Sequence, residues 1–253
     1  MKKILTLGMV AALLAFACAA HAYPTLAGPT GLIQAPTAMV VAPGSFDLAV
    51  DYDASKNKET FENDSYPLRA QFGVGGGLEI GGGYDVSAFD GKGFWNVNAK
   101  YQLPYSFCGM TTAVGALYGE ARDIPVWGGG TTEIKATQVY FAGTNHFDCI
   151  IPLSVTLGVN WTQLEENNKQ SGVRAQIGVE AKVFQDLALV GDIQSSAKNM
   201  NPYQKNLWSA GARYAFTPEL KAEAGVTNGL FNGMSSRANF FVGMNLAFGN
   251  NAK

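Results

Sequence analysis

Apolar and polar residues alternate with a period of two along most of this chain. In one stretch, apolar residues stand at positions 173, 175, 177, 179, 181 and 183, separated by Arg, Gln, Gly, Glu and Lys. A β-strand places successive side chains on opposite faces, whereas an amphipathic helix needs apolar residues at spacings of three and four. The alternation therefore predicts strands with one apolar and one polar face.

About twelve segments of this kind follow one another after residue 44. Each is about ten residues long, the length that a tilted strand needs to cross a bilayer. The sequence thus predicts an all-β fold, an antiparallel up-and-down transmembrane β-barrel formed by residues 45–253. The segments lie near 45–54, 66–75, 77–87, 93–103, 109–120, 132–144, 152–163, 172–184, 186–196, 206–216, 218–227 and 238–248.

The connections between these segments fall into two alternating sets. Short turns at one end and longer loops at the other are typical of membrane barrels, whose turns are periplasmic and whose loops are extracellular. A soluble sandwich is the alternative, but it would bury its apolar face. The short set is 75–77, 104–108, 145–151, 185–186 and 217–218, and the longer, more polar set is 55–65, 88–92, 121–131, 165–171, 197–205 and 228–237.

Large aromatic residues fall near the segment ends on the apolar face. Such girdles mark the two membrane interfaces of a barrel, so outer-membrane lipid is an expected partner. The last segment ends on an aromatic residue, as outer-membrane proteins read by the barrel-insertion machinery do, although five residues follow it. The aromatic residues are Trp95, Tyr101, Tyr118, Trp161, Trp208, Tyr214, Phe240 and Phe248.

The N-terminus has the organisation of a signal peptide. Lys2 and Lys3 precede an apolar run at 4–17, and Ala20-His21-Ala22 forms a cleavage signal. Residues 1–22 are therefore predicted to be removed on export to the bacterial outer membrane. No apolar run of about 18 residues follows, so no transmembrane helix is expected.

Composition narrows the classes of function. Hydrophobic residues make up 47% of the chain and charged residues only 15%, with a formal net charge of −2. No basic stripe is present, so nucleic acid is not expected as a partner. The glycine runs at 75–77, 81–83 and 128–130 lack the strand–loop–helix context and the Lys-Ser or Lys-Thr of a phosphate loop. No cofactor is expected, and no metal is expected either.

Charged residues on the polar faces are candidates for lining the barrel lumen. Buried charges are tolerated when they are paired or hydrated. Acids and bases nearly balance here, which predicts either an ion-pair network or a water-filled lumen without strong ion selectivity. The candidate lumen-lining charges are Asp47, Asp51, Arg69, Glu79, Asp85, Lys100, Glu133, Lys135, Arg174, Glu180, Lys182, Asp192, Arg213, Lys221 and Glu223.

Cys108 and Cys149 are the cysteines that remain after the signal peptide, and both fall in short turns predicted at the same end. The periplasm is oxidising, so they form a candidate disulfide, with two unpaired thiols as the alternative.

Residues 23–44 differ from the rest because they contain four prolines, which disfavour a regular strand. This Pro-rich leader is expected to pack in or under the lumen, or to form a short extra strand.

Four motifs in the first third of the chain resemble a known family. They are Gly-Leu-Ile-Gln-Ala-Pro-Thr-Ala at 31–38, Pro43-Gly44, Tyr66-Pro67 and Gly-Leu-Glu-Ile-Gly at 77–81. They are similar to the start of the YjbH-type outer-membrane β-barrel family, mainly over residues 28–86. The resemblance implies an envelope role in exopolysaccharide production or export.

We therefore expect a monomeric, passive small channel or an envelope component linked to exopolysaccharide export, with polysaccharide or small polar solutes as partners. The alternative is a non-channel structural or adhesive barrel that binds partners through its extracellular loops. An outer-membrane hydrolase is less favoured and no enzyme activity is expected, because His146, the only histidine after the signal peptide, lies in a predicted periplasmic turn.

Overall fold

The computed structural model describes residues 23–57, 61–87, 93–125, 131–166, 168–197, 200, 205–228 and 238–249. The predicted signal peptide at 1–22, the predicted loop at 88–92 and most of the one at 228–237 lie outside the described residues. The strands are β1 (Phe46–Asn57), β2 (Phe61–Gly75), β3 (Leu78–Ser87), β4 (Phe94–Gln102), β5 (Thr111–Pro125), β6 (Thr131–Phe147), β7 (Leu153–Glu165), β8 (Lys169–Lys182), β9 (Leu187–Gln194), β10 (Leu207–Ala215), β11 (Leu220–Thr227) and β12 (Asn239–Phe248).

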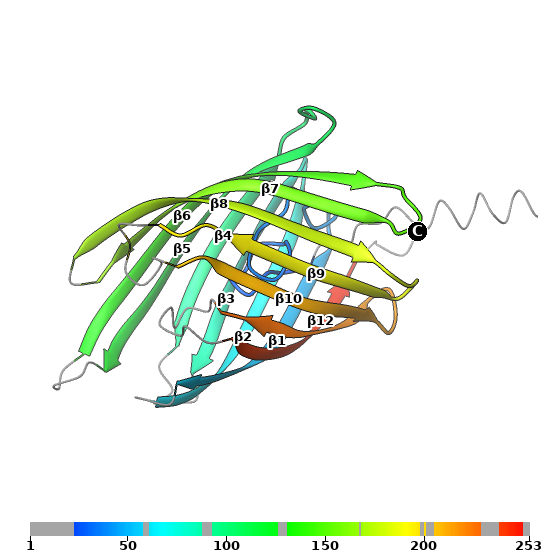
Figure 1. Ribbon diagram of the computed structural model, residues 1–253. Coiled ribbons are helices and arrows are strands. Elements are labelled where there is room, and N and C mark those ends of the chain that lie inside the picture. The colour runs from blue at the N-terminus through cyan, green and yellow to red at the C-terminus, as the bar shows by residue number, and fades with distance from the viewer. Residues whose placement is uncertain are drawn as a thin grey trace, which may run out of the picture.

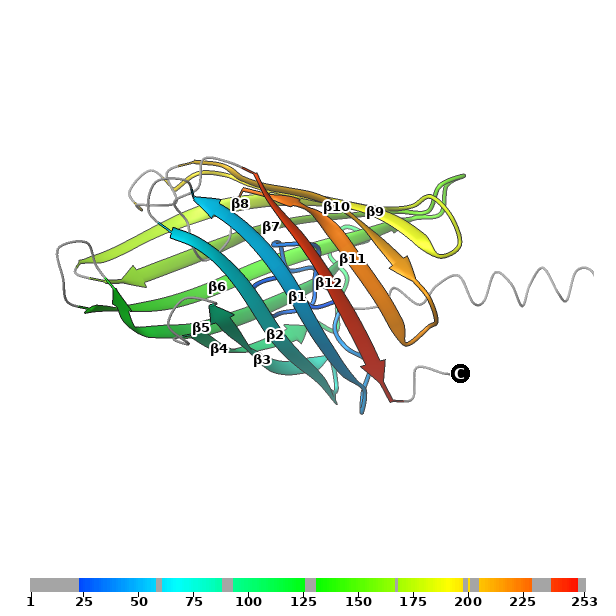
Figure 2. The same ribbon diagram turned by 90° about the horizontal axis from the view of Figure 1, so that it is seen from below.

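These strands form one closed barrel (Figures 1 and 2). Each strand pairs antiparallel with its neighbour in the sequence, and β1 pairs with β12 from Phe46↔Phe248 to Ala54↔Phe240. Closure leaves no strand edge unpaired, as a sheet surrounded by lipid requires. The structure confirms the predicted all-β, antiparallel barrel of twelve strands.

The connections at the two ends differ from the prediction in one respect. At the end that holds the β2–β3 turn, here called the turn end, Gly76 and Gly77 have φ values of 60° and 84°, which glycine adopts without strain. At the opposite, loop end, β1–β2, β5–β6 and β7–β8 continue through much of what was predicted as loops at 55–65, 121–131 and 165–171. The ladder hydrogen bonds persist after the apolar alternation stops, so these loop predictions were too long.

The two faces of the wall are inverted relative to a soluble protein. Val97 and Leu157 are 52% and 47% exposed on the outside, whereas Lys100 and Asn160 are each 1% exposed on the inside. A soluble sandwich would bury its apolar face, so this arrangement excludes that alternative. A continuous exposed apolar wall of this kind is suited to contact with lipid.

The predicted aromatic residues lie on the outer wall towards the two strand ends. Trp95, Trp161 and Trp208 stand on the loop-end half, and the rings of Trp95 and Tyr118 are 5.7 Å apart. Tyr214 lies on the turn-end half. Their positions correspond to interfacial girdles. Among the described residues, no helix has the length and apolar character needed to cross a membrane.

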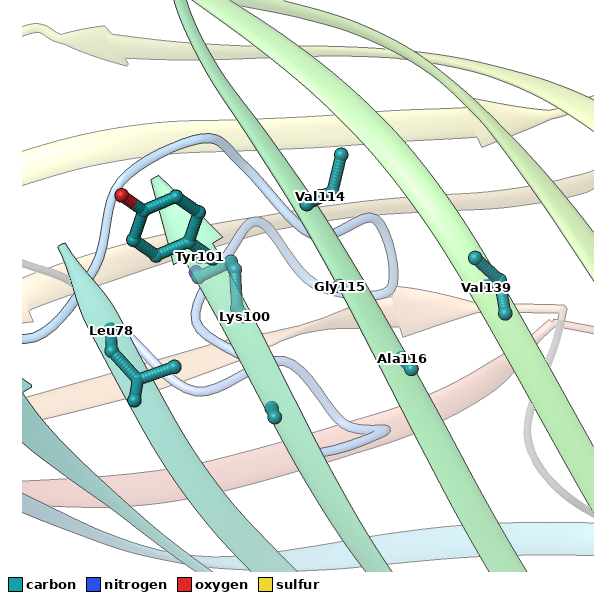
Figure 3. Close-up of a pocket in the computed structure, with 8 residues that line it drawn as sticks. Leu78, Lys100, Tyr101, Val114, Gly115, Ala116 and Val139 are labelled. Carbon is teal, nitrogen blue, oxygen red and sulfur yellow. The ribbon is translucent and has the colours of Figure 1, made fainter. Parts of the chain in front are cut away.

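Small residues make shallow grooves on the outer wall. One groove of about 300 Å³ lies across β3–β6, where Ala99, Gly115 and Ala116 leave room beside Tyr101 and Val139 (Figure 3). A larger groove of about 670 Å³ covers β1–β3 and the adjoining β11 and β12. Both open on the apolar side of the wall, away from the polar interior.

Candidate functional site

Residues 23–44, here called the N-terminal segment, lie inside the ring of strands (Figures 1 and 2). The segment folds back on itself through two isolated bridges, Pro24↔Thr30 and Gly31↔Pro36, and is not one of the twelve wall strands. Its prolines explain this, because they cannot supply ladder hydrogen bonds. The lumen is therefore occupied by the chain's own backbone.

A small apolar cluster forms the centre of this packing. Segment residues in it meet one side chain from β9 and one from β12. The segment thus brings its own core into an otherwise polar interior. The cluster consists of Leu26, Leu32, Ile33, Ala35, Val190 and Phe241.

The first polar anchor is the buried ion pair of Glu79 on β3 and Lys100 on β4. The Lys100 Nζ atom lies 3.5 Å from the Glu79 Oε2 atom. Glu79 accepts hydrogen bonds from the Thr30 amide at 3.1 Å, the Thr30 hydroxyl at 2.7 Å and the Val41 amide at 2.9 Å. Lys100 donates to the Thr30 carbonyl at 2.9 Å, and also to the Thr30 hydroxyl and the Met39 carbonyl. One ion pair therefore holds both limbs of the segment.

The second anchor is Asp192 on β9. Its Oδ2 atom accepts hydrogen bonds from the amides of Ile33 and Gln34, each at 3.0 Å. Consecutive backbone N–H groups that converge on one carboxylate form an anion-binding concavity. The charge of Asp192 is thus stabilised by the segment's backbone.

The third anchor is Arg213 on β10. The carboxylates of Glu180 and Glu223 pair with it, the first at 2.9 Å. Its Nη2 atom donates to the Gly31 carbonyl at 3.1 Å, and its guanidinium carbon lies 4.3 Å from the centre of the Tyr23 ring. A cation over an aromatic face is attractive, so Arg213 holds the start of the segment by two kinds of contact.

Twelve of the predicted lumen charges lie on the inner face of the wall. They stand on β1–β4 and β8–β11. Several of them form ion pairs with each other: Arg69 pairs with Asp51, and Arg213 pairs with Glu180 and Glu223. The twelve are Asp47, Asp51, Arg69, Glu79, Asp85, Lys100, Arg174, Glu180, Asp192, Arg213, Lys221 and Glu223. Lys182 has the same phase on β8 but is exposed at the turn end.

Glu133 and Lys135 were predicted to line the lumen, and the structure places them on the outer face. They alternate in phase with Val139, which is exposed on the outer wall. There Glu133 bonds Lys135 at 3.2 Å and approaches Arg122 at 3.4 Å, and Arg122 also pairs with Glu120. The prediction equated polar with inward, which fails where the β5–β6 hairpin extends past the aromatic girdle.

Some residues of the inner face were not predicted from the sequence. Asp53 is 1% exposed and shares the alternation of Asp47 and Asp51, so the same pattern would have found it. Gln71, Asn96 and Asn98 are also buried on the inner face and were missed because only charged residues were considered.

Cys108 and Cys149 are exposed in the turns β4–β5 and β6–β7, both at the turn end, and the structure holds them as free thiols. The disulfide stays a prediction. If it forms after export, thiol labelling of unreduced, denatured protein should find no free cysteine, and labelling after reduction should find both. Two reactive thiols in the unreduced sample would contradict it.

His146 also lies at the turn end, where its Nδ1 is 2.7 Å from the Ser154 hydroxyl. Its other nitrogen faces the Met39 sulfur at 3.5 Å, where a catalytic triad would place a carboxylate. Within the described residues, no three His, Cys, Asp or Glu side chains gather as a metal site.

No family model matches the chain, and no curated protein matches it by sequence. Solved outer-membrane porins share its fold. The KdgM porin, solved in complex with disordered oligogalacturonate, is 14% identical with a TM-score of 0.54 and covers 81% of this chain and 99% of its own. An outer-membrane channel from Pseudomonas putida F1 is 12% identical with a TM-score of 0.54 (83% and 97% covered), and the NanC porin is 13% identical with a TM-score of 0.50 (81% and 100%).

Proposed function

We propose that the protein is a passive outer-membrane channel for small polar solutes, with the N-terminal segment narrowing its lumen at rest. The polar inner face of a closed barrel carries this proposal, because polar groups that the segment leaves uncovered suit contact with water and polar solutes. The pairing of Arg69 with Asp51 and of Lys100 with Glu79 leaves little net field, so ion selectivity should be weak.

Short sugars are the solutes that we propose. Hydroxyl-rich molecules suit a wall that offers both donors and acceptors. The KdgM porin, which shares the fold, was solved with an oligogalacturonate. The motifs at 31–38 and 77–81 resemble the YjbH-type family, and on that resemblance we also propose an envelope role connected with exopolysaccharide export. We further propose that residues 1–22 are removed on export and that the barrel acts as a monomer.

Planar-bilayer recording on the full chain tests the proposal. We expect discrete conductance steps that are infrequent because the segment occupies the lumen, and we expect proteoliposomes to admit a neutral trisaccharide such as maltotriose. Heat-modifiable migration on a gel verifies in parallel that the barrel is folded. A folded, inserted barrel that neither conducts nor admits maltotriose would refute the channel.

A structural or adhesive barrel is the second candidate. Its support is that residues 23–44 fill the lumen and that the β5–β6 hairpin extends beyond its neighbours. Such a barrel would bind partners through its loop end and would give no conductance.

A further inference from the structure

Three amide side chains gather on the inner face of β2 and β4, and we call Gln71, Asn96 and Asn98 the amide cluster. They stand on either side of two inward glycines of β3: Gln71 and Asn98 both pair with Gly81, and Asn96 pairs with Gly83. A Cβ at Gly83 would lie 2.9 Å from Asn96 Nδ2, and one at Gly81 would collide with the Gln71 amide. The glycines therefore provide a flat floor on which the amides lie.

The amide cluster is deeply buried yet incompletely bonded. Gln71, Asn96 and Asn98 are 0%, 6% and 7% exposed. Among the described residues, Gln71 Oε1, Asn96 Oδ1 and both polar atoms of the Asn98 side chain have no hydrogen-bond partner. Unbonded buried polar atoms cost free energy, so their retention points to a partner from outside the wall.

The surrounding charges indicate which kind of partner fits. The two nearest cations along these strands are already paired, Arg69 with Asp51 and Lys100 with Glu79. Within the described parts of β2, β3 and β4, no unpaired cation is left for a carboxylate or a phosphate. Amides both donate and accept hydrogen bonds, as hydroxyl groups do, so the site suits a neutral, hydroxyl-bearing molecule.

The N-terminal segment currently covers this site with a single tight turn. Gly28 has a φ of 122° and bonds back to the Thr25 carbonyl at 2.9 Å. Its own carbonyl accepts a hydrogen bond from Gln71 Nε2 at 2.7 Å. A Cβ at Gly28 would lie 2.9 Å from Asn98 Nδ2 and 3.0 Å from Asn96 Oδ1, and its φ would strain any residue other than glycine.

We infer that the amide cluster is a binding site for a neutral saccharide, and that the Gly28 turn occupies it in competition with that ligand. A peptide turn supplies one carbonyl to Gln71 and leaves Asn96 Oδ1 and the Asn98 amide unbonded, whereas a sugar ring supplies several hydroxyls to all three amides. Sugar binding would then favour the conformation in which the segment has withdrawn. This inference rests on the proposed channel and adds the solute class and its site.

A thiol placed in the segment reports on withdrawal in the full chain. Ala38 is fully buried, and an Ala38→Cys substitution in a Cys108→Ser, Cys149→Ser background gives one reporter thiol once residues 1–22, which contain Cys18, have been removed. Maltotriose is expected to raise its labelling rate about tenfold, in a saturable manner, while trigalacturonate of similar size has little effect. Labelling that maltotriose leaves unchanged, or that only the acidic sugar accelerates, would overturn the inference. Conductance recorded on the same preparation separates this failure from failure of the channel itself.

Three further variants make the test specific. Gly28→Ala should speed labelling without sugar, because a φ of 122° is strained for alanine, and it shows that the reporter can respond. Asn98→Leu should weaken the maltotriose effect about tenfold. Asn160→Leu is the matched control, because Asn160 already bonds Gln176 and Gln194 at 3.3 and 3.4 Å, and it should keep the effect. Equal responses of the Asn98 and Asn160 variants would also overturn the inference.

Discussion

Replacement of Lys100 by Met is expected to release the N-terminal segment and to lower the free energy of unfolding by about 3–5 kcal/mol. The substitution removes the donor to the Thr30 and Met39 carbonyls and leaves Glu79, whose side chain is fully buried, without its cation. An uncompensated buried carboxylate costs more than the lost hydrogen bonds alone. Urea unfolding in lipid vesicles measures the loss, and limited proteolysis should cut the segment first.

The double variant Lys100→Met, Glu79→Gln is the control for this effect. It removes both charges, so a substantial part of the lost stability should return, although the segment still lacks its anchor. Conductance steps should be more frequent in both variants than in the wild type. Equal stability of the single variant and the wild type would show that this ion pair does not hold the segment.

Leu157→Arg is expected to destabilise the inserted barrel by about 2–4 kcal/mol. Leu157 is 47% exposed on the outer wall of β7. It lies midway along the strand between Trp161 at the loop end and Leu153 at the turn end. A guanidinium at that depth would lie in hydrocarbon without a partner. Reversible unfolding in vesicles gives the change in free energy.

Val173→Arg provides the comparison at another depth. Val173 is also exposed on the outer wall, but it pairs with Trp161 at the level of the girdle, where an arginine costs only about 0–1 kcal/mol. If the two substitutions had the same small effect, the outer wall would not face lipid.

The wall of this protein was largely predictable from its sequence, whereas its interior was not. A period of two assigns each residue to a face, and membrane contact then decides which face is apolar, so all twelve strands and the outward tryptophans followed from the pattern. The same rule misplaced Glu133 and Lys135, because beyond the bilayer both faces of a hairpin meet water. The contacts of Thr30 with Glu79 and of Ile33 with Asp192 span 49 and 159 residues, and no local pattern encodes such separations.

Pairing of β1 with β12 joins the first and last strands and closes the barrel wall. The N-terminal segment, which the closed wall surrounds, comes before all of the strands in the sequence. The first of its three anchors, on β3 and β4, is synthesised early, and the other two, on β9 and β10, are synthesised late. The segment can therefore serve as a template during assembly, gathering the early hairpins first and then drawing the late ones towards them. Completion of the cylinder and capture of its contents should accordingly be a single cooperative step.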